Sequence, residues 1–580
     1  MSSTKLAEAN GGVSRAVGPQ SIWAVLQRGA ALDPQRTALI VPAQSKNHLS
    51  RLARPGKESS KDSRQCVSSV QSLMRQCTSM PLLLGSLASW FLPKPVEPDC
   101  LTWSFAELQT ATLRVSSFLR QSNIQPRSKI LLIVPSSIEW ALMLWVCAFN
   151  CYTVVTVDKV VFEDPNKTHL KQYIRDVAPS AVMVSTANEA AVIEEFIGDE
   201  TLFVGITTEA EEKSVSSRWI SMGAIADSPL ADQLTVKPAQ DSLDRLAMII
   251  YTSGSSSNKP KPCLRRVSEL LEPFTITQKI PAFTPPLALV GSKTYQAGAP
   301  AILFTTWYSG NATVLVKESS DPNITASAIT KYKPLTLSIM VHMADMIYQH
   351  LQQHSDQNTD SLKLVQLIGS TVTIEALRRT QKTFRNAKVA AAYGMTEAAC
   401  MIGWPSGPPK LDDMPSFMGI AASGYVLPGA KCKVVDENGR TLPCNQAGTI
   451  HLSGSMVAKG YMGNVGASSF YTENDTQWYA TSDCAVMDEK GLVYILGRSD
   501  GVLVRDNVLV PAATIQNLLE SVFPHSTVSD ILSLKVHFAN KTGCHCHCTG
   551  QERRKRPICC VRLPGGEYGR GGENSRADIG

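Results

Sequence analysis

The sequence predicts an α/β fold: a large N-terminal domain of layered, mainly parallel sheets and helices plus a β-rich subdomain, followed by a small, incomplete α+β C-terminal domain. Three observations lead to this expectation. Short apolar runs alternate with helical patterns between residues 101 and 368, as in parallel sheets covered by helices. From residue 431 short strands and turns follow one another directly. Beyond residue 535 no apolar period remains that could build a core.

The first expected element is a helix that leads into an apolar strand over residues 21–41, after a flexible N-terminus at 1–20. Residues 45–98 are rich in Ser, Lys and Arg and have little periodicity, which predicts an insertion or loop. A strand at 101–104 and a helix to residue 119 follow. The later strands expected in parallel sheets are 130–134, 153–157, 181–184, 202–204, 247–251, 312–316 and 364–368.

Residues 130–150 are rich in Leu, Val and Trp, but Pro135 and Glu139 interrupt them. A membrane-spanning helix needs about 20 apolar residues without such breaks. We therefore expect a buried strand, a turn and a core helix here, and no integral membrane association. The shorter apolar run 82–92 is expected to belong to the insertion rather than to a surface helix that contacts lipid.

The β-rich part is expected to consist of hairpins. Its turns are supplied by Glu437-Asn438-Gly439 and Glu489-Lys490-Gly491, because Asn and Gly tolerate the backbone angles of tight turns. The strands expected around them are 431–435, 449–453, 484–487 and 492–496.

Composition narrows the class of protein. Hydrophobic residues make up 43% of the 580 residues and charged residues 18%, which is typical of a globular chain. The net charge of +6 is small for this length and argues against nucleic acid as a partner. The fifteen Cys follow no regular framework and no signal peptide is recognised, so we expect reduced thiols and a cytoplasmic protein.

The last residues, 536–580, are expected to form a disordered tail rich in Cys, Arg and Gly. The alternating Cys-His-Cys-His-Cys run at 544–548 suggests a zinc site, but structural zinc ligands usually come as spaced pairs around a core. The basic run 553–556 is likewise better explained as solvated tail than as a nucleic-acid site.

A candidate phosphate-binding loop follows the apolar strand 246–250 directly. A small, hydroxyl-rich loop lets backbone N–H groups approach phosphates, and a Lys neutralises their charge. The loop differs from the GxxxxGK[ST] pattern, and the alternative is a flexible Ser-rich surface loop. Its candidate binding residues are Thr252, Ser253, Gly254, Ser255, Ser256 and Lys261.

This loop resembles the phosphate-binding signature of the adenylate-forming (AMP-binding) superfamily, which includes acyl-CoA synthetases, peptide-synthetase adenylation domains and luciferases. Ser257-Asn258 stands where the family usually has a Gly, and the loop is one residue longer. Because Ser tolerates fewer backbone conformations than Gly, we expect this difference from the family to restrict how the loop closes over phosphates.

A second match is Ala392-Tyr393-Gly394-Met395-Thr396-Glu397, which is similar to the family's YGxTE motif. The resemblance implies that Tyr393 stacks on adenine, that Thr396 contacts the α-phosphate and that Glu397 binds Mg²⁺. A carboxylate beside phosphates suits a hard cation. The alternative is an ordinary strand-to-helix turn with Thr396 and Glu397 near a helix N-terminus.

A third match is the block from Thr481 to Asp500, which resembles the family's TGD…GR pattern with a Ser before Asp483. The resemblance implies that Asp483 binds the ribose hydroxyls, that Arg498 supports the nucleotide and that Asp500 occupies the hinge before a C-terminal lid. Upstream, Gly369 and Ser370 resemble the strand end that lines the adenine site.

Together the matches imply a carboxylic-acid activating ligase over residues 21–498, with a partial C-terminal lid at 499–535. ATP and Mg²⁺ would activate a small carboxylic acid as an acyl-adenylate, and coenzyme A or a phosphopantetheine arm would accept the acyl group. Lys261, Thr396 and Glu397 would be catalytic. No counterpart of the family's late catalytic Lys is found in the sequence, which predicts a severe loss in the first half-reaction.

Three functions remain open at this point: a stand-alone acyl- or aryl-CoA ligase, the adenylation unit of a peptide synthetase-like or reductase-like system that loads a carrier protein, and a catalytically impaired AMP- or acyl-binding protein. Residues 287–307 contain no Asp that could hold an α-ammonium group, which favours an aryl, fatty or polyketide-like acid, as in secondary metabolism. His342 is either an acyl-pocket residue or a satisfied core histidine.

Overall fold

The fold is taken from a computed structural model. It describes residues 5–12, 19–54, 99–198, 203–208, 216–228, 236–252, 260–277, 287–317, 319–354, 356–505, 508–515 and 518. Statements below refer to these residues.

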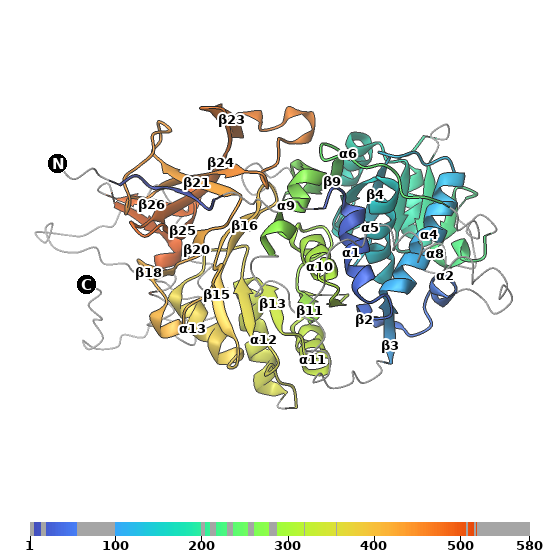
Figure 1. Ribbon diagram of the computed structural model, residues 1–580, viewed down its shortest axis with the longest axis horizontal. Helices are drawn as coiled ribbons and strands as arrows, with labels where there is room; N and C mark the ends of the chain where they lie inside the picture. Colours follow the sequence, from blue (N-terminus) through green and yellow to red (C-terminus); the bar gives the residue numbers. More distant parts are fainter. Residues whose placement is uncertain are drawn as a thin grey trace, which may run out of the picture.

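The first sheet lies at one end of the elongated molecule and is parallel except for its edge strand, which runs antiparallel to its neighbour (Figure 1). Its described strands, in spatial order, are β10 (Pro262–Arg266), β9 (Leu246–Tyr251), β5 (Thr153–Thr156), β4 (Lys129–Ile133), β6 (Ala181–Val184), β7 (Val204–Thr207) and β8 (Trp219–Ser221).

The second sheet is also parallel except at the edge where β3 pairs with β2. Its described strands, in spatial order, are β15 (Lys388–Ala391), β14 (Leu364–Leu367), β13 (Thr336–Ile339), β11 (Leu287–Val290), β12 (Ala312–Leu315), β2 (Thr37–Ser45) and β3 (Cys100–Ser104).

One hydrophobic core joins these two sheets through the helices that pack between them. Every residue of α5 is buried, so this helix is surrounded by protein on all sides. Within this core Trp145 lies 6.0 Å from Trp23 and 5.7 Å from Trp307, measured between ring centroids. The longer helices that contribute to the core are α1 (Ile22–Leu32), α4 (Phe105–Gln121), α5 (Ile138–Asn150), α9 (Val267–Thr277) and α10 (Gly298–Tyr308).

Helices also cover the outer faces of both parallel sheets. The first sheet packs on α6 (Thr168–Val177) and α7 (Ala187–Glu194), and the second packs on α11 (Pro322–Tyr332), α12 (Val341–Gln353) and α13 (Ile374–Thr383). Several helices begin where the sequence offers a cap: Ser104 and Glu107 form a reciprocal capping box at the start of α4. The short helices α2 (Ser50–Ala53) and α8 (Met222–Ile225) lie beside α4.

The β-rich subdomain is an antiparallel sheet with its own core. Its described strands are, in spatial order, β1 (Glu8–Asn10), β21 (Ala430–Val435), β22 (Gly448–Gly454), β24 (Thr476–Met487), β25 (Leu492–Arg498), β20 (Gly424–Val426), β17 (Ala399–Gly403) and β16 (Tyr393–Met395), with β23 (Phe470–Glu473) on β24. Two further pairs are β18 (Ser416–Phe417) with β19 (Ile420–Ala421), and β26 (Val502–Arg505) with β27 (Val508–Pro511).

The layered α/β architecture and the hairpin-rich subdomain confirm the predicted fold class. Some boundaries differ. The flexible N-terminus expected at 1–20 is corrected in part, because β1 extends the subdomain sheet by pairing with β21 and Ala7 is fully buried. In the segment expected as an insertion from residue 45, α2 packs against α4, while residues 55–98 lie outside the described part. The strand expected at 202–204 is β7, displaced toward the C-terminus.

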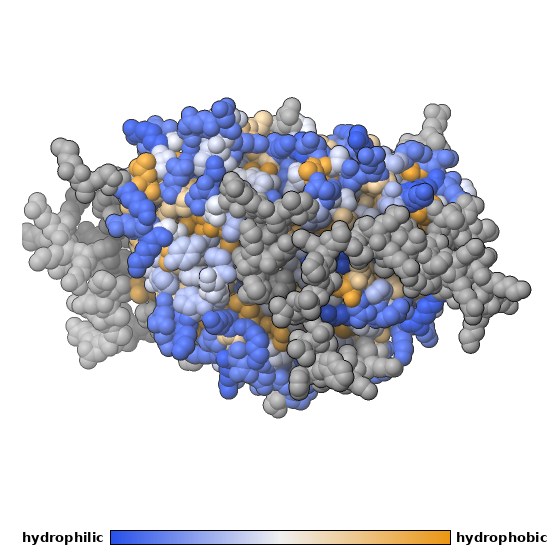
Figure 2. All heavy atoms as spheres, viewed as in Figure 1, coloured by the Kyte–Doolittle hydropathy of each residue, from blue (hydrophilic) through white to orange (hydrophobic). Residues whose placement is uncertain are grey.

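No helix among the described residues is both long and apolar enough to cross a membrane. The apolar α5 packs inside the protein, as the interrupting Pro135 and Glu139 led us to expect. On the face shown in Figure 2 the described surface is mainly hydrophilic, with apolar residues scattered between.

Candidate active site

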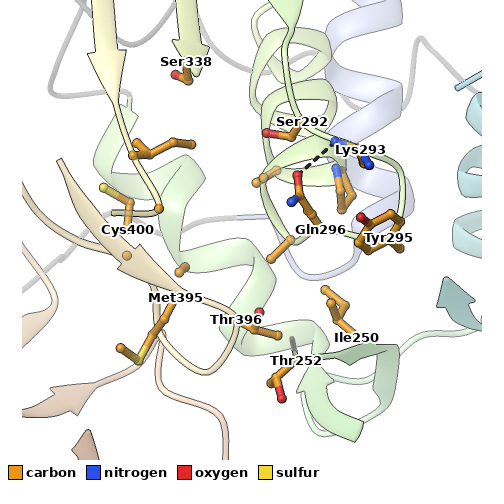
Figure 3. Close-up of a pocket in the computed structure, with 18 of the residues that line it drawn as sticks. Ile250, Thr252, Ser292, Lys293, Tyr295, Gln296, Ser338, Met395, Thr396 and Cys400 are labelled. Atoms are coloured by element: carbon orange, nitrogen blue, oxygen red, sulfur yellow. Dashed lines mark hydrogen bonds between the residues drawn. The ribbon is translucent and has the colours of Figure 1, made fainter. Parts of the chain in front are cut away.

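A cavity of about 1290 Å³ is lined by residues of both parallel sheets, α9, α10 and the β-rich subdomain. Figure 3 shows side chains from β9, β13, β16, β17 and the β11–α10 loop around it. Parallel strands present the loops after their carboxyl ends at one edge of a sheet, where ligands of α/β proteins commonly bind. The sites expected from three separate stretches of sequence therefore share one space.

The two ends of the candidate phosphate loop are held together at this cavity. Thr252 follows β9 directly, and its N–H donates to the carbonyl of Lys261 at 3.0 Å. The N–H of Lys261 in turn donates to Thr252 Oγ1 at 3.2 Å. Lys261 Nζ lies 5.6 Å from the centroid of the Tyr461 ring. The predicted loop residues Ser253, Gly254, Ser255 and Ser256 lie outside the described residues.

Asp483 lies at the centre of a second group of polar side chains. The hydroxyl of Tyr393 donates to Asp483 Oδ2 at 2.7 Å, and Arg498 Nη1 lies 3.5 Å from Asp483 Oδ1. Neighbouring strands place them, because Asp483 on β24 is the register partner of Arg498 on β25. Burial and the adjacent Asp483 charge raise the pKa of Tyr393 well above its ordinary value, so the phenol stays a neutral donor.

Asp483 is buried and belongs to β24, so it does not lie in an exposed hairpin turn. The contacts of Asp483 join β24 and β25 to β16, a strand from a much earlier part of the sequence. The predicted residues Gly369, Ser370 and Ala392 line the same cavity. Gly369 adopts a φ of +79° at the end of β14, a conformation that Gly adopts at little cost.

Thr396 and Glu397 lie in the connection between β16 and β17, a β-hairpin. The alternative of a helix N-terminus at this motif is therefore wrong. Gly394 allows the hairpin to close tightly, because a Cβ there would lie 2.3 Å from the carbonyl oxygen of Ala399. The Glu397 side chain is buried in the protein, but it is one of the residues that line the cavity.

The Glu397 carboxylate is oriented by two tyrosines that the sequence analysis did not include in the site. Tyr461 donates its hydroxyl to Glu397 Oε1 at 2.5 Å, and the hydroxyls of Tyr461 and Tyr479 are 3.1 Å apart. Burial, followed by the charge of Glu397, raises the pKa of Tyr461 above its ordinary range. The contact of Tyr461 with Glu397 joins residues 64 positions apart and is not visible in the sequence.

The residues around Glu397 fit a divalent cation bound together with phosphates. No cationic side chain in the described part of the chain forms an ion pair with this carboxylate, and its donors are neutral hydroxyls. Hard cations such as Mg²⁺ bind one or two carboxylates and complete their shell with phosphate oxygens and water. The described residues contain no group of three or more His, Cys, Asp or Glu side chains that could hold a metal alone.

Two other predicted residues, Asp500 and His342, differ in their position relative to the cavity. Asp500 is exposed in the 3₁₀ turn Ser499–Gly501 and is not among the residues that line the cavity. His342 is exposed at the start of α12 and lines the cavity, so the alternative of a satisfied core histidine is wrong. The Cys-His run at 544–548 lies outside the described residues.

The remaining cavity wall includes residues of β5, the 3₁₀ turn Lys159–Phe162, α6, α9, α10, α12, β13 and β14. The wall residues from α10, β13 and β14 are apolar or neutral, and Ser338 Oγ lies 3.3 Å from Gln366 Oε1 on the neighbouring strand. Figure 3 shows Ser338 far from Thr252 and Thr396, with the loop of Ser292 and Gln296 facing the cavity. One cavity thus combines a polar, charged region with a less polar one.

Comparison with known proteins shows the family to which the chain belongs. The sequence model of one protein family, described as AMP-binding enzyme, matches residues 95–462, which is more than half of the chain. The chain therefore belongs to the AMP-binding family and is an adenylate-forming ligase. At the level of this family, the reaction is activation of a carboxylic acid by adenylation, followed in acyl-CoA ligases by transfer to coenzyme A.

Among curated proteins, the chain is similar to an acyl–CoA ligase of Pestalotiopsis microspora, with 28% identity over 73% of this chain and 74% of that protein. It is also similar to 4-coumarate–CoA ligase 4 of Arabidopsis thaliana, with 22% identity over 76% of each chain. The solved structure of the anthranilate CoA ligase AuaEII with anthranoyl-AMP aligns with a TM-score of 0.66 and 16% identity, over 87% of this chain and 83% of that one. At this identity the structural likeness shows the fold.

Proposed function

We propose that the protein is an acyl- or aryl-CoA ligase that binds ATP in the polar region of the cavity and a carboxylic acid in the less polar region. The observation that carries the proposal is the convergence of three segments on one cavity: the β9–β10 junction, the β16–β17 hairpin and the β24–β25 pair. The first two segments lie within residues 95–462, which the family model matches, and all three carry the motif resemblances found in the sequence.

In the first half-reaction, a carboxylate oxygen of the acid attacks the α-phosphorus of ATP. The bond from the α-phosphorus to the bridging oxygen breaks and pyrophosphate leaves. Such a transfer needs positioning and charge neutralisation more than covalent help. We assign charge neutralisation to Lys261, contact with the α-phosphate to Thr396, and the ribose hydroxyls to Asp483. A Mg²⁺ ion held by Glu397 would neutralise phosphate charge when bound.

In the second half-reaction, the thiol of coenzyme A attacks the acyl carbon, loses its proton, and displaces AMP to leave a thioester. The acceptor on a carrier protein would react in the same way. We favour free coenzyme A because the relatives with extensive coverage of both chains are CoA ligases, whereas the carrier-protein ligases match only 28% of this chain.

We infer that the acid lacks an α-amino group. The cavity residues that come from α10, β13 and β14 include no carboxylate that could pair with an ammonium group. Buried charges need such partners, so an amino acid would bind poorly there. Aryl, fatty and polyketide-like acids, of the kind activated in secondary metabolism, satisfy this condition.

The test is ATP–pyrophosphate exchange with the full chain over a panel of aryl, fatty and amino acids, followed by mass spectrometry for the thioester after addition of coenzyme A. We expect exchange with at least one acid lacking an α-amine, and thioester formation with that acid. Exchange without a CoA thioester would favour a carrier-protein acceptor. Binding of ATP without exchange would favour the impaired binding protein, and exchange limited to amino acids would contradict the substrate class.

A further inference from the structure

A buried arginine connects the phosphate-loop strand to the Thr396–Glu397 turn. Arg265 lies on β10, four residues beyond Lys261, and is 2% exposed. Its Nη1 donates to the carbonyl of Thr396 at 2.6 Å, and its Nη2 donates to the carbonyl of Met456 at 2.9 Å. Because a guanidinium is a rigid planar fork, these two hydrogen bonds fix both carbonyls relative to β10.

Glu269 holds the guanidinium in this orientation. Its Oε2 lies 3.4 Å from Arg265 Nε and accepts a hydrogen bond from the backbone N–H of Arg266 at 3.0 Å. Both side chains of the Arg265–Glu269 pair are 2% exposed. A buried charge without a partner is strongly destabilising, so each member of the pair keeps the other in place.

The turn is anchored on its other side as well. The N–H of Ala458 donates to the carbonyl of Glu397 at 2.7 Å, and Met456 belongs to the same segment as Ala458. Arg265 therefore binds the turn and the segment that supports it. Since Lys261 immediately precedes β10, the strand that carries Arg265, the distance between the Lys261 ammonium and the Glu397 carboxylate depends on this contact.

We propose that Arg265, held by Glu269, is a positioning residue that keeps the Thr396–Glu397 turn in register with Lys261 for binding of the ATP triphosphate and its divalent cation. This inference rests on the proposed function. Arg265 also lines the cavity, and the role proposed for it is exerted through the backbone carbonyls of Thr396 and Met456. Adenosine recognition by Tyr393, Asp483 and Arg498 should not depend on it.

Arg265→Lys keeps the charge beside Glu269, but a single ammonium cannot reproduce the two-carbonyl fork. Arg266→Lys is the matched control, because Arg266 also faces Glu269, at 3.6 Å, yet its side chain is 27% exposed and no hydrogen bond joins it to the turn among the described contacts. Calorimetry with the full chain would measure affinity for adenosine, and for ATP over a range of Mg²⁺ concentrations.

We expect Arg265→Lys to weaken MgATP binding by at least about tenfold and to raise the Mg²⁺ concentration needed for half-saturation. Adenosine affinity should change by less than about twofold, and Arg266→Lys should leave both ligands within that range. Glu269→Gln, which leaves the guanidinium present but less firmly held, should shift MgATP in the same direction as Arg265→Lys.

The inference is overturned if Arg265→Lys binds MgATP like Arg266→Lys, or if it loses adenosine and MgATP affinity in equal measure, as general structural damage would produce. Thermal unfolding of each variant identifies such damage independently. Failure of the proposed function is distinct, because the wild-type chain would then bind neither adenosine nor MgATP.

Discussion

At the scale of single residues, Asp483 is the side chain on which the nucleotide assignment depends most. Its two carboxylate oxygens face different partners, the Tyr393 hydroxyl and the Arg498 guanidinium. A carboxylate held in this way presents its remaining lone pairs in fixed directions, which suits a pair of neighbouring sugar hydroxyls.

Asp483→Asn should lower the affinity for AMP by about tenfold or more, because hydrogen bonds to charged groups contribute about 1.5–3 kcal/mol. Calorimetric titration with AMP measures the loss. Asp488→Asn is the control: Asp488 lies in the turn of the same hairpin, where it accepts backbone N–H groups of Lys490 and Leu492, and it does not line the cavity. Equal AMP affinity in the two variants would contradict a role for Asp483.

At the scale of elements, the β16–β17 hairpin explains why a Gly precedes the Thr396–Glu397 turn. A Cβ on Gly394 would lie 2.3 Å from Ala399 O and 2.8 Å from Cys400 Cα, both backbone atoms that cannot rotate away. The two strands would have to separate, and the turn between them would move.

Gly394→Ala should therefore lower the free energy of unfolding by about 1–3 kcal/mol, the usual cost of overpacking, and should also weaken MgATP binding. Gly403→Ala, on β17 of the same hairpin, is the matched control because its Cβ would make only ordinary contacts at 3.8 Å or more. Denaturant unfolding and MgATP titration test both effects. Unchanged stability in Gly394→Ala would show that the hairpin is looser than described.

The β-rich subdomain contains a histidine whose titration should affect stability. Burial, and next the charge of Lys433, lower the pKa of His451 to about 4 from an ordinary value of 6.5. Tyr471 Oη lies 2.7 Å from His451 Nδ1, which can accept its proton when the imidazole is neutral. Between these two pKa values the unfolded chain binds a proton that the folded chain does not, so stability falls as the pH is lowered.

His451→Gln keeps an acceptor for Tyr471 but cannot titrate. Its free energy of unfolding should therefore decline less than that of the wild type between pH 7 and pH 5, values that span much of the interval in which the proton-binding difference develops. Denaturant unfolding at the two pH values gives the comparison. Identical pH dependence in both proteins would mean that His451 titrates in the folded state as it does in the unfolded chain.

At the scale of the whole molecule, the stability of the two parallel sheets depends on one shared hydrophobic core around α5. Trp145 is fully buried and contacts Trp23, Phe105 and Trp307, which come from three other elements. Trp145→Ala should lower the free energy of unfolding by about 3–5 kcal/mol, through lost burial and a cavity.

Circular dichroism during denaturant unfolding checks this value without relying on tryptophan fluorescence. Tyr348→Ala provides the comparison, because Tyr348 is exposed on α12 and its loss should cost at most about 1 kcal/mol. A similar small effect for Trp145→Ala would show that the sheets do not share a tightly packed core.

The sequence predicts the layers well because a buried strand can be recognised from the apolar residues of that strand alone. The run 181–184 coincides with β6, and 130–134 nearly coincides with β4, since buried parallel strands are continuously apolar. The motif residues Tyr393 and Asp483 could be assigned from resemblance. Their mutual hydrogen bond could not, because it depends on a sheet register between distant strands.

Arg265 shows the limit of such prediction. In sequence Arg265-Arg266 is an ordinary basic pair after a Ser-rich loop, which is typical of solvated surface. Its burial depends on Thr396 and Met456, which lie 131 and 191 residues away. Tyr461 was overlooked for the same reason, since its hydroxyl meets Glu397, 64 residues away, only in the folded β-rich subdomain.

The central claim is that the segments around Thr252, Tyr393 and Asp483 bind one nucleotide together. Competitive calorimetry of the wild-type chain, with AMP titrated in the absence and presence of saturating MgATP, tests it most directly. We expect a single AMP site per chain, and we expect MgATP to abolish AMP binding at that site. Absence of AMP and ATP binding at every Mg²⁺ concentration, or simultaneous binding of both, would contradict it.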